Sequence, residues 1–544
     1  MRLTVVLEAR CPAALRELAT RVSDPASREY AQHLDRDALA RLVALPDDDG
    51  RALISWLADH EIPLHEADDD VNDGRRRVFT ATARSLEAAL GEATARELLA
   101  QRYLPPSRCR DALPRRLAGL VSTLELSPDS VDRWSAPIDF ARDLPLCGAA
   151  PAASGMRPRD VARGYGFDDA TDGRGETIAI LALGGVPRLG DLQAFWRAHA
   201  IAPPDVHLVR VGPLGTRADH PLYRFETTMA IAWAGALAPA ARLVVYVIDP
   251  ACVADPWSAF LLAVLADTAR APTIAVTTWS CPERQYYRVH GGDLFRGLLD
   301  QAAAIGVTVI AATGDWGAYD GMPASPAANG RVIDAPWPHA SFPAVESRVL
   351  AVGGTRVLAI DPWSEAAWSA PVSPALREAL ALDGLAGGGG FSDHVAIPEW
   401  QRAALAPFHP RSGGAPSVVP YGRGVPDVAL MAWGEPAAYQ CFLDGEPRDD
   451  AGGTSTAAPI WAAIAARLNQ RRREQGLGRV GCAQPLFYRF AAEAPEVFRA
   501  ITEGATDMVL PALDGSGARV PVSIAGYRAR EGWNPATGLG VPRV

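Results

Sequence analysis

A serine hydroxyl stands at the junction between a glycine turn and an amphipathic helix. The segment 452–459 reads Gly-Gly-Thr-Ser-Thr-Ala-Ala-Pro, and the serine is Ser455. The apolar residues that follow recur at helical spacing, which places Ser455 in the first turn of the helix. Free N–H groups and the positive end of the helix dipole would stabilise negative charge on an attacked carbonyl there. These residues leave two interpretations open, a catalytic nucleophile or a hydroxyl that only caps the helix.

A nucleophilic serine needs a base, and the sequence offers no convincing histidine for that role. The first strong apolar strand, 177–183, runs into Gly184-Gly185-Val186 without an Asp at its end. The His-Gly pair at 290–291 lacks the surroundings expected of a catalytic histidine. A glutamate is the alternative, provided that its environment brings its pKa close to the working pH. His339 and His394 remain as substitutes if no carboxylate serves.

Five segments resemble, in the same order along the chain, signatures of the sedolisin or serine-carboxyl peptidase family. They are Phe225–Pro239, Thr278–Glu283, Ala311–Gly317, Gly424–Val428 and Gly532–Gly540. The Gly-Thr-Ser string with its Pro also resembles the nucleophile motif of subtilisin-like peptidases. The resemblance implies that Ser455 is the nucleophile, Glu226 its general base and Asp315 the acid that stabilises the oxyanion.

The resemblance also implies which residues contact a peptide-like or otherwise acylated substrate. Trp279 is expected to form the wall of a substrate subsite, although a core position is the alternative. Ser341 stands where many relatives carry an acidic residue, which predicts a neutral specificity pocket. The remaining residues expected to contact the substrate are Ser280, Gly314 and Gly453.

The chain departs from the family at the base. The family carries an Asp one helical turn after the Glu, and here that position is Ala230. Glu226 therefore lacks both a hydrogen bond and a like charge, so the sequence does not give the sign of its net pKa shift. Two functions stay open: an altered acyl hydrolase or acyl transferase, and a catalytically inactive pseudo-peptidase that only binds.

A second departure lies near the C-terminus. The family holds calcium there with an Asp-Ile pair and a Gly-x-Gly-x-Asp run, a set of oxygen ligands suited to a hard cation. The matching residues are Ala500-Ile501 and 530–534, where both carboxylates are missing and Arg530 adds a positive charge. We therefore expect no metal and no cofactor.

The resemblance divides the chain into three parts. Residues 1–140 resemble the pro-kumamolisin-type propeptide and are expected to form an α+β domain of ferredoxin-like type, with one helix near 86–99. A linker is expected at 141–156, and a subtilisin-like catalytic domain at 157–544. Alternating strands and helices from 177 to 312 predict a parallel sheet with helices on both faces. Inserts near 319–338 and 504–526 are long for loops.

Composition limits the partners. The 544 residues are 48% hydrophobic and carry a net charge of −10, which disfavours nucleic-acid and anionic-membrane binding. The Arg run at 471–473 is expected to be the solvated end of the Ser455 helix. No signal-like segment and no apolar run of membrane-spanning length is evident, and seven scattered cysteines indicate reduced thiols. These features predict a cytoplasmic protein whose propeptide binds intramolecularly and remains attached.

Overall fold

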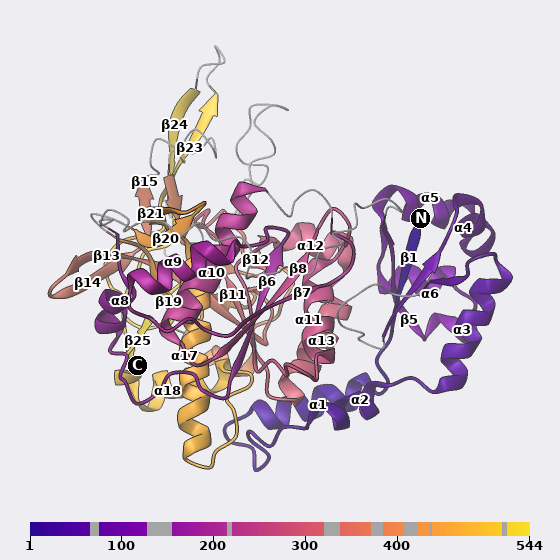
Figure 1. Ribbon diagram of the computed structural model, residues 1–544, viewed down its shortest axis with the longest axis horizontal. Helices are drawn as coiled ribbons and strands as arrows, with labels where there is room; N and C mark the ends of the chain where they lie inside the picture. Colours follow the sequence, from indigo (N-terminus) through magenta and orange to yellow (C-terminus); the bar gives the residue numbers. More distant parts are fainter. Residues whose placement is uncertain are drawn as a thin grey trace.

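The structure is a computed structural model, with an N-terminal domain and a larger domain that together enclose several apolar cores (Figure 1). It describes residues 1–65, 75–127, 155–214, 220–319, 338–371, 384–406, 421–434, 438–513 and 519–544. The predicted linker at 141–156 lies almost wholly outside the described residues, as does most of the insert predicted at 319–338.

The N-terminal domain is a five-stranded antiparallel sheet with strand order β2-β3-β1-β5-β4 and flanking helices. Leu3, Val5 and Leu7 of the central strand point into a core of its own. The helix predicted near 86–99 is two helices, because Gly91 between them has φ +79°. The elements are β1 Arg2–Leu7, α1 Pro12–Ser23, α2 Arg36–Val43, α3 Asp47–Asp59, β2 Leu64–His65, β3 Arg76–Thr80, α4 Ala83–Leu90, α5 Glu92–Gln101, β4 Tyr103–Leu104, α6 Pro106–Ala112, α7 Arg115–Ala118 and β5 Val121–Ser127.

The larger domain is built on the predicted parallel sheet. Seven strands run in the order β14-β13-β11-β9-β6-β8-β7, and β19 pairs with β13 as the eighth. All these pairs are parallel except β13 with β14. The strands are β6 Thr177–Leu183, β7 Val206–Arg210, β8 Arg242–Ile248, β9 Ile274–Thr277, β11 Thr308–Ala312, β13 Val349–Ile360, β14 Trp363–Ala367 and β19 Val428–Gly434.

Helices cover both faces of this sheet, because alternate side chains of β6 are buried in two different cores. Ile178 and Ile180 pack into the core beneath α10 and α17, whereas Ala179 and Leu181 pack into the core beneath α11 and α13. The helices of this domain are α8 Pro158–Tyr165, α9 Leu189–Ala198, α10 Pro221–Leu237, α11 Pro256–Ala266, α12 Glu283–His290, α13 Asp293–Ala304, α16 Arg402–Leu405, α17 Thr454–Glu474 and α18 Gln484–Glu493, with 3-10 turns η2 Glu399–Gln401 and η3 Pro495–Val497.

Short strand pairs form separate two-stranded sheets outside the main sheet. The insert predicted at 504–526 contains the hairpin of β23 and β24, which projects from the body of the domain (Figure 1). The short strands are β10 Cys281–Pro282, β12 Ser341–Phe342, β15 Ser369–Pro371, β16 Gly384–Ala386, β17 Gly390–Phe391, β18 Gly424–Val425, β20 Tyr439–Leu443, β21 Glu446–Ala451, β22 Phe498–Arg499, β23 Met508–Leu513, β24 Arg519–Ile524 and β25 Val541–Pro542.

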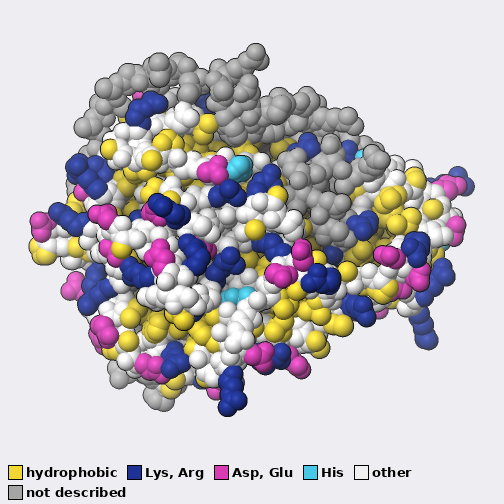
Figure 2. Space-filling view, turned by 60° about the horizontal axis from the view of Figure 1, so that its bottom comes forward, with side chains coloured by type: hydrophobic (Ala, Val, Ile, Leu, Met, Phe, Trp, Pro, Cys, Tyr) yellow, Lys and Arg dark blue, Asp and Glu magenta, His cyan; other side chains and the backbone are white. Residues whose placement is uncertain are grey.

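The visible surface mixes charges of both signs. On the face that Figure 2 shows, Arg side chains are interspersed with Asp and Glu side chains and with apolar patches. Among the described residues, no helix combines the length and the apolar character needed to cross a membrane.

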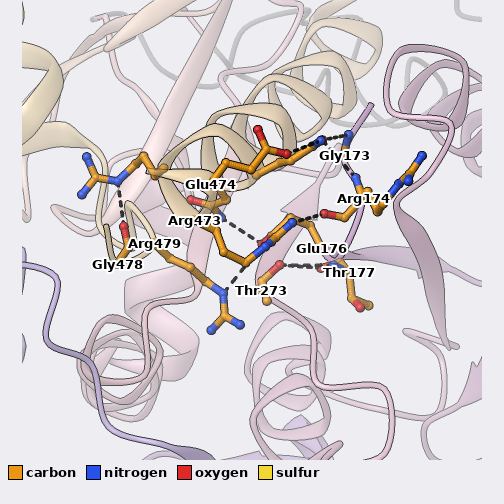
Figure 3. A network of polar contacts seen from close by, with 12 residues as sticks. Gly173, Arg174, Glu176, Thr177, Thr273, Arg473, Glu474, Gly478 and Arg479 are labelled. Carbon is orange, nitrogen blue, oxygen red and sulfur yellow. Dashed lines mark hydrogen bonds and ion pairs between the residues drawn. The ribbon is translucent and has the colours of Figure 1, made fainter. Parts of the chain in front are cut away.

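The C-terminal end of α17 is tied to the start of β6 by the polar network in Figure 3. Buried Glu176 accepts hydrogen bonds from Arg473 and from Asn469 Nδ2, the latter at 3.3 Å. Gln470 Oε1 accepts the backbone N–H groups of residues 172–174 at 2.8 to 3.2 Å. Arg471 also pairs with Asp168, at 2.6 Å. The arginine run lies in the last turn of α17 with the Arg471 and Arg473 side chains 43% and 47% exposed, as predicted, and these two residues also form ion pairs.

Candidate active site

Ser455 is the second residue of α17, as the sequence predicts. The helix begins at Thr454 after Gly453, whose φ is +89° and whose N–H donates to Ala432 O at 2.8 Å. This left-handed backbone angle requires glycine and turns the chain sharply into the helix. Thr454 and Thr456 are buried, whereas Ser455 is partly exposed. The Ser455 hydroxyl is thus the accessible one in the first turn.

Asp315 lies just beyond the end of β11 and faces the start of α17. Its Oδ1 accepts the Thr454 N–H at 2.8 Å and the Thr454 hydroxyl at 2.7 Å. A Cβ on Gly453 would lie 2.3 Å from Asp315 Oδ2, so only glycine leaves room for this carboxyl group. Burial raises the pKa of Asp315, and the Thr454 bonds offset only part of that rise. A protonated carboxyl group here can donate a hydrogen bond to an oxyanion.

Glu226 reaches the same place from α10, which packs along α17. The two helices are joined by a hydrogen bond from Thr456 Oγ1 to Met229 Sδ at 3.0 Å. Burial raises the pKa of Glu226 to about 7, while hydrogen bonding with Ser455 and Thr278 opposes the rise and the charge of Asp315 adds to it. A glutamate with this pKa is suited to accept the serine proton near neutral pH.

The missing partner at Ala230 has a visible consequence. Ala230 is 1% exposed and follows Glu226 by one helical turn. Oε1 of Glu226 is buried and has no hydrogen-bond partner among the described residues. Nothing at position 230 fixes this oxygen, so the carboxylate is held less firmly than one with a paired acid.

Trp279 and Ser280 lie just past β9 and are both partly exposed. The Trp279 ring lies 5.1 Å from that of Tyr223, which precedes Glu226 by three residues on α10. Trp257 Nε1 donates to the Trp279 carbonyl at 3.2 Å and holds the backbone. This arrangement places an aromatic pair beside the base, and the subsite role of Trp279 and Ser280 remains a prediction.

The other expected substrate residues lie on the Asp315 side. Gly314 is buried, has φ +92°, and its carbonyl accepts the Gly388 N–H at 2.8 Å. Ser341 is 1% exposed, and its hydroxyl donates to the Thr313 carbonyl at 3.0 Å. The Ser341 side chain is therefore engaged with backbone, and its role in a specificity pocket stays a prediction.

Sequence reasoning missed the two threonines that support the carboxyl groups. Thr454 holds Asp315 and Thr278 contacts Glu226. The position of Thr454 in the Gly-Thr-Ser string was a usable signal, because a hydroxyl at a helix start often bonds a neighbouring group. Thr278 gave no such signal. The substitute base His394 packs on Tyr287 at 4.5 Å, and His339 is 3% exposed.

Comparison with known proteins identifies the architecture. Residues 1–96 match the family model of the pro-kumamolisin activation domain. Kumamolisin of Bacillus sp. (strain MN-32) is 37% identical over 411 residues, which span 72% of this chain and 63% of that protein. The chain belongs to the sedolisin family.

Two further relatives agree. Physarolisin of Physarum polycephalum is 28% identical over 65% of this chain and 60% of its own length. The solved structure of Pseudomonas sedolisin, complexed with pseudo-iodotyrostatin, superposes with a TM-score of 0.55 at 22% identity, covering 72% of this chain and 97% of the other. That likeness confirms the predicted subtilisin-like fold. The chain spans less than two thirds of the length of kumamolisin and of physarolisin.

The calcium site implied by the sedolisin family does not fit this member. Asn534, 1% exposed, donates through Nδ2 to the carbonyls of Arg530 and Gly532 at 3.0 and 3.3 Å. Its Oδ1 accepts the N–H groups of Ala536 and Thr537 at 3.1 and 3.0 Å. The carbonyl oxygens that could serve a cation thus face an amide donor instead. No cluster of metal-ligating side chains is found elsewhere in the described ranges.

Proposed function

We propose that this sedolisin is a serine-carboxyl acyl hydrolase or acyl transferase that acts on a peptide-like substrate. One observation carries the proposal: the accessible Ser455 hydroxyl adjoins Glu226, whose pKa is raised to about 7 by burial, and Asp315 is held beside the same helix start. The three residues come from α17, α10 and the end of β11, so the fold assembles them from distant parts of the chain.

In the proposed reaction, Glu226 first accepts a proton and later returns it. Ionised Glu226 takes the proton of Ser455 Oγ as this oxygen attacks the substrate carbonyl. Protonated Asp315 donates a hydrogen bond to the oxyanion, assisted by the N–H groups at the start of α17. Glu226 then returns the proton to the leaving group, and an acyl ester on Ser455 remains. Water hydrolyses the ester, or an amine or alcohol takes the acyl group.

The two carboxyl groups set the pH dependence. Glu226 acts as a base only when ionised, so activity rises as pH increases through about 7. Asp315 donates only when protonated, and its raised pKa extends that state to higher pH than an exposed aspartic acid would allow. Activity therefore also requires a pH low enough for Asp315 to stay protonated, and it is lost as Asp315 ionises.

A second function is favoured by a specific observation: Oε1 of Glu226, beside Ala230, has no hydrogen-bond partner within the described ranges. A carboxylate that is not oriented toward Ser455 would leave a cleft that binds peptides without cleaving them. In that case the protein is a pseudo-peptidase that serves as a binding protein or scaffold.

Covalent labelling separates the two functions. Purified protein is incubated with a fluorophosphonate probe at pH 7.5 and its intact mass is measured. The hydrolase proposal expects a single adduct that Ser455→Ala abolishes and that Ser27→Ala, a control in the N-terminal domain, retains. An absence of adduct at every pH from 4 to 9, with a correctly folded protein, would leave only the binding function.

The proposed setting is a reducing compartment such as the cytoplasm. Support comes from the free thiols of four described cysteines, Cys11, Cys109, Cys441 and Cys482. The interspersed charges on the face in Figure 2 and the net charge of −10 support a partner that is not a nucleic acid. Cell fractionation of a tagged chain tests the location.

A further inference from the structure

A hollow of about 530 Å³ lies on the larger domain along one face of α12. This volume is typical of sites that bind small molecules. Residues three and four positions apart on a helix share a face, which brings the side chains of α12 to the hollow together. Its side chains come from α12, from the first turn of α13 and from the segment after β17: Arg284, Tyr287, Arg288, Arg296, Asp393 and His394.

Positive charge exceeds negative charge around this hollow. Arg284 pairs with Asp393, and Arg296 Nε donates to buried Glu346 at 3.1 Å. Arg288 is exposed, and its guanidinium makes no ion pair or hydrogen bond with any residue that the structure describes. Three guanidinium groups are thus set against two carboxylates, in a protein whose net charge is −10. Arg288 is the cation that remains available for an anion.

The imidazole of His394 is a second available group. Neither of its ring nitrogens forms a hydrogen bond within the described ranges. Burial lowers the pKa of His394, and the charges of Arg284 and Arg296 lower it as well, whereas Asp393 opposes them. An anion bound beside the ring would favour the imidazolium form and raise this pKa.

Tyr287 holds two of these groups in place. Its ring lies 5.0 Å from Arg296 Cζ and 4.5 Å from the His394 ring, and its hydroxyl donates to Glu346 Oε1 at 2.6 Å. A Cβ on Gly292, where φ is +83°, would lie 2.7 Å from the same ring, so glycine lets the turn before α13 pass this close. Groups that are already fixed lose little freedom when they bind a ligand.

The segment that carries His394 is anchored to the first residue of α12. Glu283 Oε1 accepts the Asp393 N–H at 2.8 Å, and its Oε2 accepts the Ser392 hydroxyl at 2.5 Å. Ser392 Oγ accepts the His394 N–H at 3.1 Å in turn. Burial raises the pKa of Glu283 to about 7, so this anchor is ionised above neutral pH. The arginines of α12 and the histidine therefore belong to one fixed unit.

A second hollow, of about 160 Å³, shares Arg296 with the first and differs from it in charge. Three arginines and three carboxylates line it, so their charges cancel: Arg16, Arg75, Arg296, Glu8, Asp293 and Asp300. An anion is therefore expected in the hollow along α12 and not in this one.

We propose that the hollow along α12 binds the phosphate group of a small ligand between Arg288, Arg296 and His394. A guanidinium group presents paired N–H donors that match the oxygens of a phosphate group, and such charge-assisted hydrogen bonds are among the strongest in proteins. Asp393 and Glu346 would repel a long acidic chain, which favours a compact anion over an acidic peptide. The site includes no residue of the proposed reaction at Ser455, so it is a separate function.

Isothermal titration of the full chain tests the site. Inorganic phosphate and glycerol 3-phosphate are titrated separately at pH 8 and constant ionic strength, where Glu283 is ionised. Both should bind saturably at one site, and the tighter of the two identifies free phosphate or a phosphate ester as the source. Arg288→Gln should weaken binding at least about tenfold, because it removes a charge-assisted contact. Arg197→Gln is the matched control, since Arg197 is likewise exposed in the last turn of a helix, and it should bind as the parent does.

NMR titration of the His394 imidazole provides an independent readout in the parent, with His394→Gln to assign the signal. The pKa of His394 should rise when inorganic phosphate is bound. The proposal is overturned if no saturable binding occurs at millimolar phosphate, if Arg197→Gln weakens binding as much as Arg288→Gln, or if a hexaglutamate peptide binds more tightly than both phosphate compounds. Should Arg288→Gln fail to fold, an unchanged pKa of His394 at saturating phosphate would overturn it instead. None of these measurements depends on catalysis.

Discussion

The two places where this chain departs from the sedolisin pattern have been resolved differently. At the calcium loop, the amide of Asn534 supplies a donor for two carbonyls and an acceptor for two N–H groups, so every group is paired. At the proposed base, Ala230 supplies no polar group, and Glu226 Oε1 is buried without a hydrogen-bond partner in the part of the chain that the structure describes. The polar groups left by the first departure are thus paired, whereas one oxygen beside the second is not. The candidate active site is therefore where we expect this chain to differ in function from its relatives.

The largest effect is expected from removing the base or the nucleophile. Glu226→Gln and Ser455→Ala should each lower kcat/KM by at least about 10³-fold, and the double variant should be no worse than either, since members of one catalytic unit fail together. Hydrolysis of a fluorogenic peptide library, measured from pH 4 to 9, tests this. In the parent, activity should fall on acidification as Glu226, whose pKa is raised to about 7, becomes protonated. A fully active Glu226→Gln would mean that another group is the base.

A smaller effect is expected at the oxyanion. Asp315→Asn keeps a hydrogen-bond donor in place and should cost roughly 10²–10³-fold in kcat, typical of one impaired donor. It should also remove the alkaline limb of the pH profile, because the amide does not ionise. Thr454→Val is the companion variant, since it deletes the hydroxyl bond at 2.7 Å and keeps the backbone N–H bond. An unchanged alkaline limb in Asp315→Asn would remove Asp315 from the mechanism.

Restoring a carboxyl group at position 230 tests most directly the contrast between the two departures from the family pattern. In Ala230→Asp, a protonated carboxyl group beside Glu226 Oε1 would stabilise the ionised base and lower its pKa. We expect peptide hydrolysis at pH 5 to rise by about tenfold, because a pKa lowered by one unit ionises about ten times more base at that pH. Ala230→Asn is the neutral control and should give part of the gain. No gain from either variant would show that the unpaired oxygen does not limit catalysis.

At the calcium loop the expected effect is on stability. Asn534→Ala leaves two buried N–H groups and two carbonyls unpaired, and should lower the free energy of unfolding by about 2–4 kcal/mol. Glu531→Ala, at an exposed neighbour, should change it by less than about 0.5 kcal/mol. Chemical denaturation with both variants measures the difference. Equal stability of the two would show that the loop is held by something other than the Asn534 amide.

The smallest effect is the one expected from removing calcium. Because Asn534 stands where the family has a carboxylate ligand and its amide donates to the neighbouring carbonyls, the melting temperature should change by no more than about 1 °C between excess chelator and millimolar calcium. A scanning fluorimetry titration is sufficient. A fall of several degrees in chelator that calcium reverses would contradict this account.

Much of the fold could be predicted, because the strongest signals are local. The strand at 242–248 and the start of α17 at Thr454 follow from apolar runs and glycine turns, and the structure confirms both. The split at Gly91 was missed, because helical periodicity continues on both sides of a glycine whose φ only the structure reveals.

The sequence predicts which residues form the candidate site, but not which contacts hold them in place. Ser455, Glu226 and Asp315 stand in recognisable strings, and the structure brings them together. The role of Thr278 and the fixed end of α17 depend on contacts between distant segments. The partner of Arg473, for example, is Glu176, 297 residues away. No spacing rule along the chain encodes such a contact.

The packing of α10 against α17 also determines when the site can appear during folding. Thr456 and Met229, which join the two helices, are 227 residues apart in the chain. Contacts of such long sequence separation form late, since the entropy of closing the intervening loop must first be overcome. Secondary structure in a refolding experiment should therefore return well before probe labelling of Ser455. The interval between the two signals would report how long the larger domain has its secondary structure but no reactive Ser455.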